Sequence, residues 1–424
     1  MNKNIYLSAA ITALLAHSIN VFAGNEEGLR DLREQVQNLE RRIDQASPAD
    51  SAANAFNPAI SLILGGTYGR LGNDPAIPAT GFAMAANPGH QQGFNLGESE
   101  LGISANIDPR FSGTATMALS PAGGLTVENA YIQTNVLGKG VNLRFGRYFS
   151  GLGYLNDQHA HAWDFVDQPL IYATFWNNQL GEDGVQLKWL APTDTFVELG
   201  GEFGRGRGFP GTDTNRNGTG SSVLFAHIGD DIGIEQSWRA GVSLHQTQRD
   251  NAVSNNVPDV PGTAGGVSNI FSGSSRTAGL DMVWKYSPNG NTANRYIKFQ
   301  GEYFQRKESG TLTYNMLNAS PYSNTQSGWY MQSVAQFMPH WRTGLRYDRL
   351  DAGIANVGAA NLNFVIANYG FQPTRTSWML DYSPSEFSRL RLQIARDQTR
   401  QTLPENQIFL QYVMSLGAHG AHSY

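Results

Sequence analysis

The sequence predicts an all-β fold, a transmembrane antiparallel β-barrel of about 16 strands with a short N-terminal α-helical coiled coil. The first observation is an alternation of apolar and polar residues, which begins near Pro58 and recurs in segments of about ten residues. The second is that short and long connectors alternate between these segments. The third is that no apolar run after the first two dozen residues is long enough to cross a bilayer as a helix.

The composition agrees with a barrel and excludes several classes of protein. Mean hydropathy is −0.35 although aromatic residues reach 11%, because a barrel turns polar side chains to its lumen and apolar ones to lipid. The 47 glycines suit strands that must twist, and the absence of cysteine excludes thiolate metal sites and thiol redox chemistry. A net charge of −5 gives no support for a nucleic-acid partner, and we expect none.

Three segments are predicted to precede the barrel. Residues 1–23 have the features of a secretory signal peptide, because Lys3 precedes an apolar stretch and Ala23 offers a small residue for cleavage before Gly24. We expect a periplasmic coiled-coil helix at 24–46, a linker rich in Ala, Ser and Pro at 47–57, and the barrel at 58–424.

The predicted helix carries a heptad pattern. Its apolar residues are spaced by three and four positions, as the a and d positions of a coiled coil are: Leu29, Leu32, Val36, Leu39 and Ile43. About three heptads are marginal alone, so an oligomeric barrel would have to supply the local concentration. The pattern therefore favours a homotrimer, and the alternative is a single amphipathic helix on the barrel rim or the membrane surface.

The strand number follows from the connectors, since outer-membrane barrels have short periplasmic turns and longer external loops. The predicted turns lie at 107–110, 137–140, 191–194, 229–232, 287–290, 338–340 and 383–386. The predicted external connectors lie at 70–92, 121–124, 150–183, 205–220, 248–274, 307–326, 350–373 and 400–404. A barrel with about 16 strands is too wide for side chains to fill, which predicts an aqueous channel.

The third external connector, residues 150–183, is the longest and has an unusual composition. No Lys or Arg occurs between Arg147 and Lys188, and aromatic residues are frequent. We expect so apolar a loop to fold against or into the barrel wall, where its acids would line a constriction. These acids are Asp157, Asp164, Asp167, Glu182 and Asp183.

Complementary basic residues are predicted on the opposite wall. In residues 388–394 the leucines and the isoleucine take the lipid face, which directs Arg389 and Arg391 into the lumen. An arginine on the lipid face near the midplane would cost about 2–4 kcal/mol. The same alternation gives a basic pore wall of Arg342, Arg346, Arg375, Arg389 and Arg391. The alternative is that these charges only hydrate the lumen and pair with one another.

Two histidines of the third connector are candidate metal ligands. His159 and His161 flank a single residue in an acid-rich segment, and imidazole with carboxylate suits zinc or copper. Structural or surface histidines are the commoner case, so no cofactor is expected and zinc remains an alternative. No nucleophile with a nearby base and oxyanion donors stands out, so we do not expect an enzyme.

Several segments resemble a family of proteobacterial outer-membrane proteins described as zinc-regulated TonB-dependent outer-membrane receptors. They are Gly93–Leu101, Ala105–Pro109, His159–Leu170 with Trp163, Gly184–Pro192, and the end of the chain from Gln411 to His422. The resemblance implies an outer-membrane protein under zinc control. The layout of a coiled coil and 16 strands is also similar to that of phosphate-selective trimeric porins.

Taken together, the residues predict a trimeric porin in the outer membrane of a Gram-negative bacterium. Small hydrophilic solutes or ions would diffuse passively through a water-filled barrel constricted by the third connector, and outer-membrane lipid would surround it. The alternative is a metal-uptake receptor in which His159, His161 and neighbouring aspartates bind zinc. The segment between the expected cleavage site and the first strand is too short for a plug domain, which disfavours energised uptake.

Overall fold

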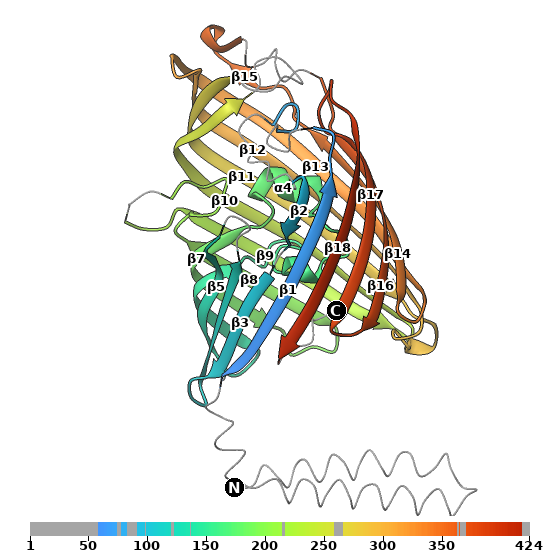
Figure 1. The fold of residues 1–424 in the computed structure, drawn as a ribbon. Coiled ribbons are helices and arrows are strands. Elements are labelled where there is room, and N and C mark those ends of the chain that lie inside the picture. Colours follow the sequence, from blue (N-terminus) through green and yellow to red (C-terminus); the bar gives the residue numbers. More distant parts are fainter. Residues whose placement is uncertain are drawn as a thin grey trace, which may run out of the picture. The chain divides into compact units, whose positions relative to one another are not determined.

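The prediction of a closed antiparallel barrel of about 16 strands is confirmed (Figure 1). The computed structural model describes residues 58–73, 78–82, 91–97, 99–119, 123–135, 137–213, 217–257, 266–362, 364 and 370–417. The predicted signal peptide at 1–23, helix at 24–46 and linker at 47–57 lie outside the described residues. Within the described part of the chain, no helix is long and apolar enough to cross a membrane.

The strands follow one another around the barrel in chain order. They are β1 (Ala59–Arg70), β2 (Gly93–Leu96), β3 (Ser99–Asn106), β4 (Phe111–Leu119), β5 (Leu125–Thr134), β6 (Val141–Phe149), β7 (Gly181–Leu190), β8 (Phe196–Gly204), β9 (Ser221–Ile232), β10 (Gln236–Val257), β11 (Val267–Tyr286), β12 (Tyr296–Tyr314), β13 (Asn318–Met338), β14 (Trp341–Asp351), β15 (Asn356–Val357), β16 (Thr374–Ser385), β17 (Ser388–Gln398) and β18 (Glu405–Gly417). The short helices are η1 (Ala160–Ala162), α4 (Leu170–Trp176), η2 (Pro288–Gly290) and η3 (Ala359–Asn361).

The barrel closes where the last strand pairs with the first. β18 runs antiparallel to β1 from Ser61↔Gly417 to Arg70↔Ile408, so no edge of the sheet remains unpaired there. β2 and β3 both pair with β1 and form one strand with a short interruption. β15 is a two-residue addition to β13. Sixteen strands therefore make up the wall.

The wall has the inverse of a soluble protein's polarity. On β11, Leu280 and Met282 are 58% and 54% exposed, whereas Asp281 between them is 5% exposed. Successive residues of a strand point to opposite faces, so the apolar side chains face outward and the polar ones inward. An outward apolar face and a polar interior match a barrel surrounded by lipid.

Two predicted long loops are instead strands. The connectors predicted at 248–274 and 307–326 are largely occupied by β10 to β13, which contain 19–22 residues each. β12 and β13 are joined by three residues only, 315–317. Beyond the apolar band the outward residues of these strands are mostly polar, whereas the inward ones include a buried apolar cluster with Phe271 and Leu312. The apolar-out, polar-in alternation is therefore lost in the sequence while the backbone ladder continues. The strands β3 to β8, by contrast, have only 8–10 residues.

Two predicted turns are displaced by a few residues. The turn predicted at 229–232 lies at 233–235, after the end of β9, and the turn predicted at 383–386 lies at 386–387. In both cases the strand, β9 or β16, continues through polar residues that are typical of a turn.

Candidate functional site in the barrel interior

The third loop, residues 150–180 between β6 and β7, folds into the interior of the barrel (Figure 1). It contains η1 and α4, and six of the seven residues of α4 are buried. Its hydrogen bonds and ion pairs reach strands from β3 to β17. The loop therefore crosses the space that the barrel encloses.

Two aspartates of the third loop pair directly with predicted wall arginines. Asp164 Oδ1 accepts a hydrogen bond from Arg342 Nη1 at 3.1 Å, and Asp164 Oδ2 forms an ion pair with Lys298 Nζ at 2.5 Å. Asp167 Oδ1 lies 2.8 Å from Arg346 Nη2, and its other oxygen lies 2.7 Å from Arg375 Nη1. The predicted acidic loop and basic wall are thus in contact, with no open gap between these pairs.

The charge of Asp164 is stabilised by its partners. Burial alone would raise the pKa of Asp164, but the cations of Lys298 and Arg342 outweigh burial and hold it well below its usual range. Asp164 is therefore ionised at neutral pH.

The remaining two predicted arginines contact the backbone of the same loop. Arg391 Nη2 donates to the Trp163 carbonyl at 2.9 Å, and Arg389 donates to the carbonyl of His161. Asp381 on β16 accepts from Arg391 Nε at 2.7 Å. All five arginines that the strand alternation assigned to the lumen therefore touch the third loop.

Glutamates of β8 and β12 hold the start of the third loop from the other side. Glu202 accepts from the Gly151 amide at 2.8 Å. Glu302 accepts from the Tyr154 amide at 3.0 Å and from the Tyr172 hydroxyl at 2.7 Å. Burial and the adjacent Glu302 carboxylate raise the pKa of Tyr172 well above its ordinary value, so the hydroxyl keeps its proton and donates.

The helix α4 is anchored by aromatic packing. The Trp176 ring lies 4.8 Å from the Phe304 ring, edge to face, and Tyr172 packs against the same ring at 5.5 Å. The guanidinium of Arg306 lies 4.2 Å from the ring centre of Phe175, a cation–π contact. These residues belong to the largest buried apolar cluster of the described chain, so the loop packs as a folded unit.

The two loop histidines contact glutamates of the wall. His159 Nδ1 lies 2.7 Å from Glu100 Oε1 on β3 and 3.1 Å from Glu128 Oε2 on β5. His161 Nδ1 bonds the second oxygen of Glu100. The His159 and His161 rings stack with centres 5.8 Å apart. The sequence predicted the histidines as candidate ligands and an inward direction for the two glutamates, but not their contact, because the glutamates are 31 residues or more away in the chain.

The other predicted loop acids lie elsewhere. Glu182 and Asp183 belong to β7, where they point to opposite faces. Glu182 is buried inside and accepts from the Gly206 amide, whereas Asp183 pairs with Arg147 at 2.7 Å on the outward side. Asp157 is exposed in the loop. The structure therefore brings together Asp164 and Asp167, but not the other three.

The half-buried charges of the interior are mostly basic. Seven such side chains lie near the short-turn ends of their strands and face inward by alternation: Arg144, Lys188, Arg239, Lys285, Lys298, Arg342 and Arg389. The half-buried interior acids are Glu128 and Glu198, to which the exposed Asp157 of the loop is added. Cations therefore dominate the part of the interior wall that water can reach below the loop.

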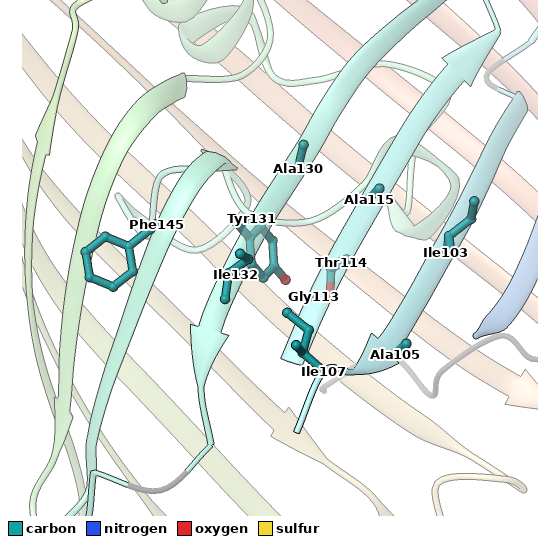
Figure 2. Close-up of a pocket in the computed structure, with 10 residues that line it drawn as sticks. All are labelled: Ile103, Ala105, Ile107, Gly113, Thr114, Ala115, Ala130, Tyr131, Ile132 and Phe145. Carbon is teal, nitrogen blue, oxygen red and sulfur yellow. The ribbon is translucent and has the colours of Figure 1, made fainter. Parts of the chain in front are cut away.

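An apolar groove lies on the outward face of β3 to β6 (Figure 2). Ile132 and Phe145, which line it, are 47% and 43% exposed, and Gly113 and Ala115 also line it. The groove faces away from the interior, and it has few polar groups that could orient a solute. It therefore belongs to the outward apolar face of the barrel.

Comparison with known proteins gives one relative and a set of similar folds. No family model matches the chain. An uncharacterized protein of Aquifex aeolicus (strain VF5) is 31% identical over 418 residues, which cover 91% of this chain and 84% of that protein.

The similar folds are those of outer-membrane proteins. A loop L8 deletion mutant of OmpT from Vibrio cholerae has a TM-score of 0.53 at 13% identity, covering 85% of this chain and 100% of that chain. OmpT in its trimer form gives 0.51 at 12%, covering 85% and 99%. Salmonella typhi OmpF in complex with daunomycin gives 0.50 at 10%, covering 86% and 99%. Such identities show a shared fold.

Proposed function

We propose that this chain, which belongs to the same family as the uncharacterized Aquifex aeolicus protein, is a porin for passive diffusion of small hydrophilic solutes or ions. A closed barrel of sixteen strands encloses more space than its own side chains fill. Its interior is polar and its outward face apolar, which suits water inside and lipid outside. These properties and the shared fold favour the outer membrane of a Gram-negative bacterium as its location.

The observation that carries the proposal is the third loop inside the barrel. A loop that is fixed to the wall through Asp164, Asp167 and Glu302 narrows the lumen at a defined depth. A narrowing lined by fixed charges sets the size and the sign of the solutes that pass. The resemblance to TonB-dependent receptors finds no support in the comparisons, and the proposed transport is passive.

Within this function, we infer a preference for anions. Seven half-buried bases face the interior below the loop, and two of them, Lys298 and Arg342, share the buried Asp164. The half-buried acids there are two, and one exposed acid is added. Fixed charge of one sign in a confined space raises the local concentration of counter-ions, and the low-dielectric wall strengthens that effect. Small anionic solutes are therefore the expected substrate class.

Single-channel recording tests the function directly. The purified full chain is added to a planar bilayer, and the zero-current potential is measured across a KCl gradient. Discrete conductance steps with chloride more permeant than potassium are expected. Absence of steps at any protein concentration would contradict the porin, and a preference for potassium would contradict only the anion preference.

We also propose that the porin is a homotrimer whose subunits meet at β3 to β7. These are short strands, and their outward face carries the groove of Figure 2. The Arg147–Asp183 ion pair also lies on this face by alternation with the exposed Phe145 and Val185. An ion pair that faces lipid is costly, and a second copy of the chain would cover it.

Light scattering in detergent tests the assembly. The mass of three chains is expected for the wild type, and Gly113→Trp, which fills the groove, is expected to reduce it to one chain. Met331→Trp on the outward face of β13 is the matched control, because Met331 is exposed on a distant strand. A trimer that tolerates Gly113→Trp would contradict an interface at this groove.

The second candidate function is zinc uptake, for which His159 and His161 are the candidate ligands in the sequence. The observation that favours metal binding is the contact of His159 with Glu100 and Glu128. Recording the same channels with and without micromolar zinc separates the two functions. A conductance that ignores zinc would leave diffusion as the function.

A further inference from the structure

The junction between the third loop and strands β3 and β5 gathers two carboxylates and two imidazoles. Glu100 bonds both histidines, one with each oxygen: its Oε1 lies 2.7 Å from His159 Nδ1, and its Oε2 bonds His161. Glu128 Oε2 lies 3.1 Å from His159 Nδ1. The side chain of Glu100 is 3% exposed and those of Glu128 and His159 are 17% and 21% exposed. The group is thus largely enclosed, with Glu128 and His159 partly accessible.

This junction differs in charge from the other contacts of the loop. Asp164 and Asp167 are each paired with Lys or Arg. Among the described residues, the ion-pair partners of Glu100 and Glu128 are histidines only. Two carboxylates therefore share a largely buried place without a Lys or Arg ion-pair partner among the described residues, and desolvating two carboxylates is costly. A divalent cation would compensate both charges.

We infer that Glu100, Glu128 and His159 form a binding site for one divalent cation of the zinc class, with His161 beside it. Imidazole nitrogen with carboxylate oxygen is the ligand set that zinc takes. One ligand atom from each of the three residues lies within 4.8 Å of the others. Tetrahedral bonds of about 2.1 Å place ligand atoms about 3.4 Å apart, so the atoms around His159 Nδ1 need to separate only slightly.

Asn129 beside His159 gives the site a distinctive second contact. Its Oδ1 accepts from the Phe149 amide at 3.1 Å, which turns its NH₂ group to His159 Nε2 at 2.9 Å. Nε2 is then an acceptor, and the ring proton is on Nδ1, where it bonds the glutamates. A metal ion at Nδ1 requires this proton to move to Nε2, so the Asn129 amide must turn and offer its oxygen.

The bound ion would act as a clamp on the loop. The arginines of β14, β16 and β17 hold the segment from His161 to Gln168 on one side of the barrel. Glu100 and Glu128 hold His159 and His161 on β3 and β5. A metal ion bound by His159, Glu100 and Glu128 would fix the start of this segment, while the arginines fix the rest. Motion of the loop across the lumen would then be reduced.

Titration calorimetry with zinc chloride on the full chain, first treated with a chelator, tests the site. One zinc per chain is expected, and His159→Ala and the pair Glu100→Gln with Glu128→Gln are expected to weaken binding at least about tenfold. His340→Ala is the matched control, since His340 lies in the short turn between β13 and β14 and bonds the Ser383 carbonyl. Wild-type affinity in His159→Ala, or no zinc bound by the wild type, would overturn the inference.

Asn129→Asp provides a second test, in which the expected result is tighter zinc binding. A misfolded variant could not produce such a gain. Aspartate can accept from both the Phe149 amide and a protonated Nε2, so this variant is expected to bind zinc more tightly than the wild type. Weaker binding than in the wild type would overturn coordination through Nδ1. These readouts do not depend on conductance, so the site and the porin function can fail separately. Heat-modifiable mobility in gels verifies that each variant forms the barrel.

Discussion

Arg346 Nη2 lies 2.8 Å from Asp167 Oδ1 and joins strand β14 to the third loop in the barrel interior. Both side chains are buried, and the same guanidinium bonds Asp348 at 2.9 Å and stacks over Phe165 at 4.6 Å. One strand residue thus holds the loop by charge, by hydrogen bonds and by an aromatic contact. Contacts of this kind fix the position of the third loop inside the barrel.

Arg346→Met is expected to destabilise the barrel and release the loop. Removing one partner of a buried ion pair costs about 3–5 kcal/mol when the other charge is left alone. Arg375 stays 2.7 Å from Asp167, so a smaller loss is expected. Urea unfolding measured by tryptophan fluorescence gives the free energy, and single-channel recording is expected to give a larger and noisier conductance. Arg396→Met on the outward face of β17 is the control. Equal stability and conductance of both variants would refute the anchoring role.

Gly153→Ala is expected to prevent the third loop from docking. Gly153 has φ +68°, and a Cβ there would overlap the Glu302 carboxylate and the Tyr172 hydroxyl. The left-handed backbone alone costs a non-glycine residue about 1–2 kcal/mol. Gly123→Ala is a matched control, because Gly123 has φ +87° but open space around it. A larger loss of unfolding free energy in Gly153→Ala is expected, and equal losses would exclude the steric contact.

The contribution of Asp164 to stability is expected to persist into acid. Its folded-state pKa is lowered, so its contribution is present above the unfolded-state pKa of about 3.9 and is lost as the pH falls through the folded-state value. The stability difference between wild type and Asp164→Asn should stay constant from pH 7 to 5 and shrink below about pH 4. Thermal unfolding across this range measures it. A difference that grows in acid would mean that the pKa is raised instead.

Neutralising two bases of the interior wall is expected to lower the anion preference. Arg144→Gln and Lys188→Gln remove two of the seven half-buried cations without touching a contact of the third loop. The zero-current potential in a KCl gradient should move toward zero while the step size changes little. Arg396→Gln outside the barrel should leave the potential unchanged. An unchanged potential in the double variant would place the selective charges elsewhere.

Much of the fold could be predicted because the alternation of residues is a local signal. The outward direction of Leu390 and the inward direction of Arg391 follow from the two-residue period of a strand, without knowledge of any neighbouring strand. The apolar-out, polar-in pattern ends where the outward face of a strand becomes polar and its inward face gains buried apolar residues such as Phe271 and Leu312. This is why β10 to β13 were predicted as loops at 248–274 and 307–326. The ladder there depends on backbone hydrogen bonds between strands, which leave no pattern in side-chain polarity.

The sequence by itself determined the barrel, its strand number and which arginines point inward, because each depends on residues close together in the chain. Only the tertiary structure decided what these residues meet. The path of the third loop brings His159 to Glu100 and Glu128 and brings Asp167 to Arg346, residues separated by 31 to 179 positions. That path is set by the packing of α4 on the wall and by buried charge pairs, and packing between distant segments has no periodicity from which it could be predicted.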